Sequence, residues 1–332
     1  MRTLFLAAVF VSASSAATAP APVYRVAAQL AAGDGGWDLL SVAPSDQRLY
    51  VAHGDGVTAF DLRTGKAVDK IVSGRRVHAA LAIPGTHEVL STNGETNNAT
   101  LFDGRTGKVL ATIPTGTKPD AAAYDPATRT IWIMNPGSGD ITVVDPVSAK
   151  VLATIAVGGS LEMGEADGHG RMYVNVEDKN VVAVLDTRSR KLVRRFPLQG
   201  CEGPSGIAVD TKTNQIVSAC GDSAVAIVSA PDGKQIARLP IGKGPDGAAV
   251  DPVRGLALIP GGRDGTLTIL RLGANPAVVE TVQTAVSART IAVDPSTGRA
   301  YLPSATLAPA PAGERPKAVP GSFRVLVVAP AP

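Results

Sequence analysis

The sequence has little of what several common functions require. Its two cysteines form no C-x-x-C-H motif, which excludes covalent attachment of a c-type haem. No glycine-rich phosphate loop is present, because the glycine clusters lead into predicted strands and not into a helix. Aromatic residues make up only 4% of the chain and the formal net charge is +3, so stacking platforms and basic stripes are both missing. We therefore expect no nucleic-acid partner.

Long apolar runs are also absent beyond the first residues. Arg2, the apolar run 4–11 and the small residues 12–17 have the pattern of an export signal, with Ser15 and Ala17 placed for cleavage after residue 17. The alternative is a buried N-terminal helix. No later segment approaches the length of a membrane-spanning helix. We expect a signal peptide at 1–17, no transmembrane segment, and an exported protein, periplasmic or secreted, that is a monomer.

A six-residue segment recurs along the chain at intervals of about 42 residues. Its copies are D-L-R-T-G-K (61–66), D-G-R-T-G-K (103–108), D-P-V-S-A-K (145–150), D-T-R-S-R-K (186–191) and the degenerate S-A-P-D-G-K (229–234). Short runs of β-forming residues, separated by turn residues, fill each interval. A period of roughly 40–45 residues with four short strands is typical of a β-propeller blade. Many unrelated activities share this fold, so it does not define a function.

Counting the units predicts an all-β, seven-bladed β-propeller with four antiparallel strands per blade. The inner strands should begin near Leu39, Ala79, Ala121, Met163, Gly206, Gly247 and Thr290. The last unit supplies only three strands, and residues 23–30 supply a fourth at the other end of the chain. We expect this segment to pair with 323–328 and close the ring, so that 18–332 form one domain without open sheet edges.

The two cysteines lie within one predicted blade. Cys201 precedes the fifth inner strand and Cys220 ends the next strand, and these two positions open on the same face of a blade. We predict a disulfide, which an oxidising compartment permits. The alternative is two separate buried thiols.

At these residues the chain resembles the YncE-like, YVTN-repeat β-propellers of bacteria. The resemblance is carried by G-C-E-G-P-S-G-I-A-V-D (200–210) with S-A-C-G-D (218–222), by the segment 161–180 and by P-G-S-F-R-V-L-V-V (320–328). The Y-V-T-N pattern itself survives loosely, as L-S-T-N (90–93), I-M-N (133–135) and Y-V-N (173–175). The resemblance implies an exported seven-bladed propeller, and it implies no particular reaction or catalytic residue.

Aligning the seven units places polar residues in one register at one mouth of the central channel. They are Asp38, His78, Asp120, Glu162, Ser205, Asp246 and Arg289. The loops after the second strands should add His53, Asn93, Asn135 and Asn175 on the same face. Such groups can ligate a hard cation or hold a positively charged small molecule. The alternative is that the repeated Asp residues cap tight turns, in which case the unrepeated His78, Glu162 and Arg289 are the best ligand-binding candidates.

A proline-rich insert, 304–320, separates the second and third strands of the last unit. Its prolines favour extended polyproline geometry, and its place in the blade puts it on the face of the candidate residues. We expect it to lie over or beside the channel mouth and to limit what reaches the channel. The alternative is a disordered loop without a role.

Two functional hypotheses remain. The first is a non-enzymatic binding or scaffold protein without a cofactor, which uses the channel-mouth face for an unknown small molecule or protein partner. The second is a hydrolase of the gluconolactonase or lactonase kind, with Ca²⁺ or another divalent cation in the channel. Its candidate ligands or bases are Glu162, Asp120, Asp246 and His78, but the Glu–Asn–Asn–Asp pattern of those enzymes does not appear at matching positions. The sequence favours the first hypothesis and assigns no catalytic residue.

Overall fold

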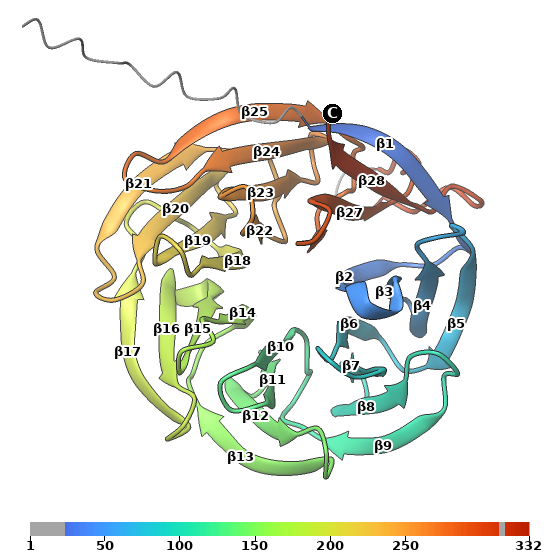
Figure 1. Ribbon diagram of the computed structural model, residues 1–332, viewed down its shortest axis with the longest axis horizontal. Helices are drawn as coiled ribbons and strands as arrows, with labels where there is room; N and C mark the ends of the chain where they lie inside the picture. The colour runs from blue at the N-terminus through green and yellow to red at the C-terminus, as the bar shows by residue number, and fades with distance from the viewer. Residues whose placement is uncertain (1–23, 312–315, 332) are drawn as a thin grey trace, which may run out of the picture.

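Seven four-stranded antiparallel sheets form a ring around a central axis, as the repeat predicts (Figure 1). This computed structural model describes residues 24–311 and 316–331. The predicted signal peptide, 1–17, lies outside these residues, as does the tip of the insert. None of the helices in the described part of the chain is long and apolar enough to cross a membrane.

Each blade runs outward from an inner strand at the axis to an exposed outer strand. The first three blades consist of β2 (Trp37–Ala43), β3 (Arg48–His53), β4 (Gly56–Asp61) and β5 (Ala67–Ser73); β6 (Val77–Ala82), β7 (Glu88–Asn93), β8 (Asn98–Asp103) and β9 (Val109–Pro114); and β10 (Ala122–Asp125), β11 (Thr130–Asn135), β12 (Asp140–Asp145) and β13 (Lys150–Ala156). The next three consist of β14 (Leu161–Ala166), β15 (Arg171–Val176), β16 (Val181–Asp186) and β17 (Lys191–Pro197); β18 (Pro204–Asp210), β19 (Gln215–Cys220), β20 (Ala224–Ser229) and β21 (Gln235–Pro240); and β22 (Ala249–Asp251), β23 (Leu256–Gly261), β24 (Thr266–Arg271) and β25 (Ala277–Gln283). Two single-turn 3₁₀ helices, η1 (Pro44–Asp46) and η2 (Glu177–Lys179), lie in the loops.

The seventh blade joins the two ends of the chain. Its order is β26 (Ala292–Asp294), β27 (Arg299–Ser304), β28 (Arg324–Pro330) and β1 (Tyr24–Ala31), with β1 antiparallel to β28. Figure 1 shows the blue β1 beside the dark red β28 at the rim. The buried Tyr24 also reaches the sixth blade, where its hydroxyl donates to Asp251 and its backbone N–H to Glu280. The predicted closure is confirmed.

The recurring D-x-R-T-G-K segment is a turn between the third and fourth strands. In the first blade the carboxylate of Asp61 accepts hydrogen bonds of 2.9 Å from the backbone N–H groups of Arg63 and Thr64. Gly65 then takes a positive φ of 72°, which glycine adopts without a steric penalty. The repeated segment that predicts the fold therefore has a structural role, which is to form this turn.

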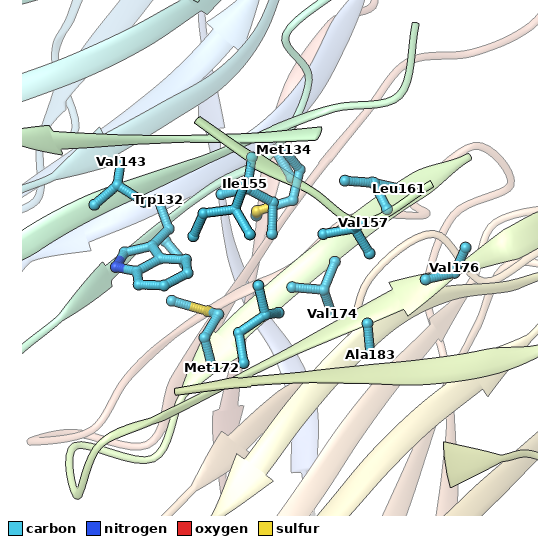
Figure 2. Close-up of a cluster of buried hydrophobic side chains, with 14 residues drawn as sticks. Trp132, Met134, Val143, Ile155, Val157, Leu161, Met172, Val174, Val176 and Ala183 are labelled. Atoms are coloured by element: carbon cyan, nitrogen blue, oxygen red, sulfur yellow. The ribbon is translucent and has the colours of Figure 1, made fainter. Parts of the chain in front are cut away.

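Apolar side chains from facing sheets fill the space between neighbouring blades. Figure 2 shows the cluster between the third and fourth blades, where Trp132 of β11 and Met172 of β15 are both fully buried. Near the axis the packing is backbone against backbone: a side chain on Gly206 of β18 would collide with the main chain of Gly247. Small residues on the inner strands thus let the blades converge at the channel.

The disulfide prediction is also confirmed. Cys201 and Cys220 are bonded, with their Cα atoms 5.3 Å apart, and both are buried. The bond ties the loop that leads into β18 to the end of β19, at the channel-mouth side of the fifth blade.

Candidate functional site

The inner strands are irregular at the candidate positions. In four blades the pairing between the first and second strands shifts register at the candidate position: between Trp37 and Leu40, Val77 and Ala80, Leu161 and Gly164, and Pro204 and Ile207. Asp38, His78, Glu162 and Ser205 lie inside these bulges. In the other three blades the candidate residue precedes the strand. A bulge re-aims a side chain that regular pleating would direct into a neighbouring sheet.

Five of the seven candidates form a chain of charged contacts around the mouth. Arg289 Nε donates to Asp246 Oδ2 at 2.8 Å, and its Nη2 lies 3.5 Å from Asp38 Oδ1. Asp38 Oδ2 is 2.8 Å from His78 Nδ1, which is 3.9 Å from Asp120 Oδ1. Residues that occupy equivalent positions in different blades are thus in contact, although they are up to 251 positions apart in the chain. We call all seven residues the mouth ring.

The carboxylates of the mouth ring do not cap turns, so the alternative interpretation of them was wrong. Among the described residues, no backbone N–H group donates to the side chain of Asp38, Asp120 or Asp246. That role belongs to acidic residues at the far ends of the inner strands, such as Asp125, which accepts from the N–H groups of Ala127 and Thr128. The two sets differ in location, and only the mouth-ring set faces the channel.

Burial and crowding of negative charge shift the titration of these groups. Burial, together with the neighbouring carboxylates of Asp120 and Asp246, raises the pKa of Glu162 to about 9. Burial and the nearby Asp38 raise the pKa of Asp120 to about 7. The hydrogen bond to Asp38 raises the pKa of His78 above its ordinary value. At neutral pH Glu162 is therefore mainly a protonated carboxyl group that can donate a hydrogen bond.

Other predicted members contribute to the framework and not to the channel surface. Ser205 is buried, and its hydroxyl donates to the carbonyl of Pro245 at 3.1 Å. Asn175 is fully buried and its amide donates to the carbonyls of Ser205 and Gly206. The prediction that the loops after the second strands add polar side chains to the mouth is wrong. These side chains are buried and form hydrogen bonds within or between blades. The four residues are His53, Asn93, Asn135 and Asn175, each 9% exposed or less.

The proline-rich insert lies beside the channel mouth, as its position in the blade predicts, but as a hairpin and not as extended polyproline chain. Leu307 and Ala318 form an antiparallel bridge, flanked by backbone hydrogen bonds from Ala308 to Lys317 and from Val319 to Thr306. Backbone pairing between the two arms replaces the geometry that the prolines favour. We call the described residues of the insert, 304–311 and 316–320, the mouth hairpin.

The base of the mouth hairpin is tied to two neighbouring loops. The Ser287 hydroxyl donates to the Ala305 carbonyl and accepts from the Ala305 N–H, at 2.8 and 3.1 Å. The N–H of Gly321, just beyond the hairpin, donates to the Asp34 carboxylate at 2.8 Å. These contacts hold the hairpin against the segment that connects β1 to β2.

A cavity of about 820 Å³ lies between the mouth hairpin and the loops of the sixth, seventh and first blades. Its walls include Trp37 and Leu307 as apolar groups and Arg263, Arg289 and Lys317 as cations. Gly262 leaves the space that Arg289 fills, since a Cβ there would lie 2.5 Å from the Cβ of Arg289. We call this space the mouth cavity.

A second, smaller cavity of about 100 Å³ lies in the channel itself. It is lined by Asp38, His78, Asp120, Glu162 and Asp246, together with Leu39, Ala121 and Met163. Asp246 lines both cavities. Its partner Arg289 therefore lies between the acidic channel and the wider mouth cavity, whose walls carry both apolar and charged groups.

Sequence reasoning missed several of these residues. Arg263, Trp37 and Lys317 line one cavity because the hairpin, which carries Lys317, lies against the other two blades' residues. Glu165 of β14 was also missed, although burial raises its pKa to about 7. Its carboxylate accepts a hydrogen bond from the N–H of Val209, in the next blade. The available signal for Glu165 was a second acidic residue in the inner strand L-E-M-G-E-A, three positions after Glu162.

Comparison with solved structures supports the fold. The chain is similar to the WD40 repeats of RRP9 (TM-score 0.77, 13% identity, 93% of this chain and 99% of that chain covered). It is also similar to a chain of Kuenenia stuttgartiensis hydrazine synthase (TM-score 0.70, 16% identity, 88% and 96% covered). A chain of the mitotic checkpoint complex matches with a TM-score of 0.73 and 14% identity, covering 99% and 98%. No family model and no curated protein matches the sequence. These similarities define the class by its fold, a seven-bladed β-propeller.

Proposed function

We propose that this protein is an exported binding protein, without catalytic activity of its own, that holds a small molecule in the mouth cavity. The observation that carries the proposal is the cavity itself. Its volume of about 820 Å³ lies within the usual range for ligand pockets, about 300–1,000 Å³. A concave site of this size suits a small molecule better than the flat face of a protein partner. A protein partner is the second candidate, because a similar β-propeller chain occurs in an assembly, the mitotic checkpoint complex.

The charges on the cavity walls indicate the chemistry of the ligand. Two acidic residues line it, but Asp34 already accepts the Gly321 N–H and Asp246 already pairs with Arg289. Arg263 and Lys317 add two further cationic groups beside apolar surface. We expect an amphiphilic ligand with an acidic group, in place of the positively charged molecule that the sequence suggested.

Export and the YncE-like assignment belong to the same proposal. The disulfide supports both, because it forms at the cysteine pair that is the most specific part of the resemblance, and such bonds persist in oxidising compartments. The lactonase alternative has weaker support. The asparagines that could have completed an oxygen ligand set are buried in hydrogen bonds within and between blades, and Asp246 is engaged by Arg289.

The experiment compares three variants by equilibrium dialysis against a metabolite extract, with mass spectrometry of what is retained. The wild-type protein should retain a defined acidic metabolite. Replacing residues 305–320 by a short Gly-Ser turn should keep the fold and abolish retention. Arg263→Gln should weaken it roughly tenfold, the effect of losing one charge-assisted hydrogen bond. Arg271→Gln, on the same blade at the opposite end of β24, is the matched control and should bind normally.

The proposal is wrong if the wild-type protein retains nothing above an unrelated protein. It is also wrong if the shortened-hairpin and Arg263→Gln variants retain the same metabolite with the same affinity. Circular dichroism of each variant checks that the blades are intact.

A further inference from the structure

Three side chains from consecutive blades converge on one point in the channel. Asp38, His78 and Asp120 each offer one ligand atom, and these three atoms all lie within 4.8 Å of one another. The spacing is 2.8 Å from His78 Nδ1 to Asp38 and 3.9 Å to Asp120. Ligand atoms around a metal ion with bonds of about 2.0–2.2 Å lie at similar separations. We call these residues the channel triad.

The backbone behind the channel triad is held in place by side chains of other strands. The hydroxyl of Thr290 donates to the carbonyl of Asp38 at 2.9 Å, and that of Thr92 donates to the carbonyl of Asp120 at 2.6 Å. The His78 ring lies against Gly94, where a Cβ would come within 2.9 Å of Nε2. This contact leaves Nδ1 facing the two carboxylates. Fixed donors of this kind are what a preorganised metal site requires.

An independent observation is the space in front of the triad. The cavity of about 100 Å³ has room for an ion and a few waters, and Glu162 is also among the residues that line it. Arg289 pairs with Asp246 at 2.8 Å, and its Nη2 also lies 3.5 Å from Asp38 Oδ1. Within residues 24–311 and 316–331, no lysine or arginine forms an ion pair with Asp120 or Glu162. One guanidinium therefore serves Asp38 and Asp246, while Asp120 and Glu162 face the small polar space without a protein cation and are suited to a cation from solution.

We propose that Asp38, His78 and Asp120 form a binding site for one divalent transition-metal ion of the zinc class. One imidazole nitrogen with two carboxylate oxygens is a typical donor set for this class, whereas Ca²⁺ takes six to eight oxygen ligands. The remaining coordination positions face the cavity, where water or Glu162 can occupy them. The site joins the first three blades at the axis. It is separate from the mouth cavity and does not depend on the ligand proposed there.

The test is metal titration of the chelator-treated mature protein by calorimetry, with Zn²⁺ and with Co²⁺ as a spectroscopic probe. One equivalent of Zn²⁺ should bind, and Co²⁺ should give visible absorption bands of a low-symmetry site. His78→Gln and Asp120→Asn should each weaken binding by roughly 100-fold, as expected for loss of a ligand. His87→Gln is the matched control, because His87 forms the same 2.8 Å contact with an aspartate, Asp46, outside the channel.

Each other outcome overturns the proposal. These are absence of stoichiometric binding, unchanged affinity in the folded Asp120→Asn protein, or equal losses in the His87 control. Binding of Ca²⁺ in preference to Zn²⁺ would contradict the assignment of a nitrogen ligand. Because the shortened-hairpin protein keeps the triad, it should bind metal normally even if the small-molecule proposal fails.

Discussion

At the residue scale, aspartates of this chain have two distinct roles that look alike in sequence. Asp61 and its equivalents accept backbone hydrogen bonds within turns, which lowers the pKa of Asp61 and brings that of Asp186 to about 2. The carboxylates of Asp38, Asp120 and Asp246 accept no such bonds from the part of the chain that the structure describes, and burial raises the pKa of Asp120 and Asp246. Hydrogen bonding stabilises the charged form in one set, and desolvation destabilises it in the other.

Glu165 provides a residue-scale prediction for pH dependence. Its pKa rises from an ordinary value of 4.5 to about 7 in the folded protein, so the folded state binds more protons than the unfolded state between these values. The contribution of Glu165 to the free energy of unfolding is therefore greatest below pH 4.5 and is lost as the pH rises through 7. Glu165→Gln should be more stable than wild type at pH 8.5, by on the order of 1–3 kcal/mol, and similar at pH 4.5. Its amide oxygen can still accept the Val209 N–H.

Urea unfolding of both proteins at several pH values measures this difference. Glu202→Gln, an exposed change, serves as the control and should follow wild type. Parallel stability curves for wild type and Glu165→Gln would show that Glu165 titrates normally.

At the element scale, the disulfide and the mouth hairpin modify single blades without altering the ring. The disulfide closes a loop with a sequence separation of 19 in the fifth blade. The hairpin extends one connection of the seventh blade, where β27 and β28 keep an antiparallel register without interruption. Both features can therefore be changed while the blade pairing remains.

Replacing Cys201 and Cys220 by serine should lower the free energy of unfolding by about 3 kcal/mol, the chain-entropy value for a loop of this size. The ring should persist, because contacts between blades account for most of the buried core. Chemical denaturation of the double variant and wild type provides the measurement.

Mass spectrometry of unreduced, denatured protein from the periplasm should find no free thiol and residues 1–17 removed; two alkylatable cysteines would contradict the bond in the cell.

At the scale of the whole molecule, closure of the ring depends on β1. Without it, the seventh blade has three strands, and β28 presents unpaired backbone groups at an open edge. The sixth blade also loses the contacts of Tyr24 with Asp251 and Glu280. The first and last blades are thus held together by a strand from the opposite end of the chain.

Deleting residues 20–31 should therefore yield protein that aggregates and unfolds at a lower temperature. Adding a peptide with the sequence of residues 24–31 should restore part of the lost stability, because it can pair with the open edge in the manner of strand addition. Size-exclusion chromatography and thermal unfolding, with a scrambled peptide as the control, measure both effects. A soluble deletion variant as stable as wild type would show that closure is dispensable.

Features that depend on local pattern and on counting could be predicted from the amino-acid sequence. The 42-residue period, the turn chemistry and the missing fourth strand together predicted seven blades and the pairing of β1 with β28. The same alignment of units placed the mouth ring in one register and the two cysteines within reach of each other. Such predictions succeed because every blade repeats one arrangement, so equivalent positions must lie at the same distance from the axis.

Which of those equivalent residues face the channel depends on contacts between blades, and these became known with the folded structure. Ser205 and Asn175 occupy repeat positions like their equivalents, yet both are buried, and each donates a hydrogen bond to a backbone carbonyl of the next blade, that of Pro245 and that of Ser205 respectively. The pairing of Asp246 with Arg289, the convergence of the channel triad and the folding of the mouth hairpin depend on side-chain geometry across blades. These contacts join residues far apart in the chain, and no local pattern encodes their distances.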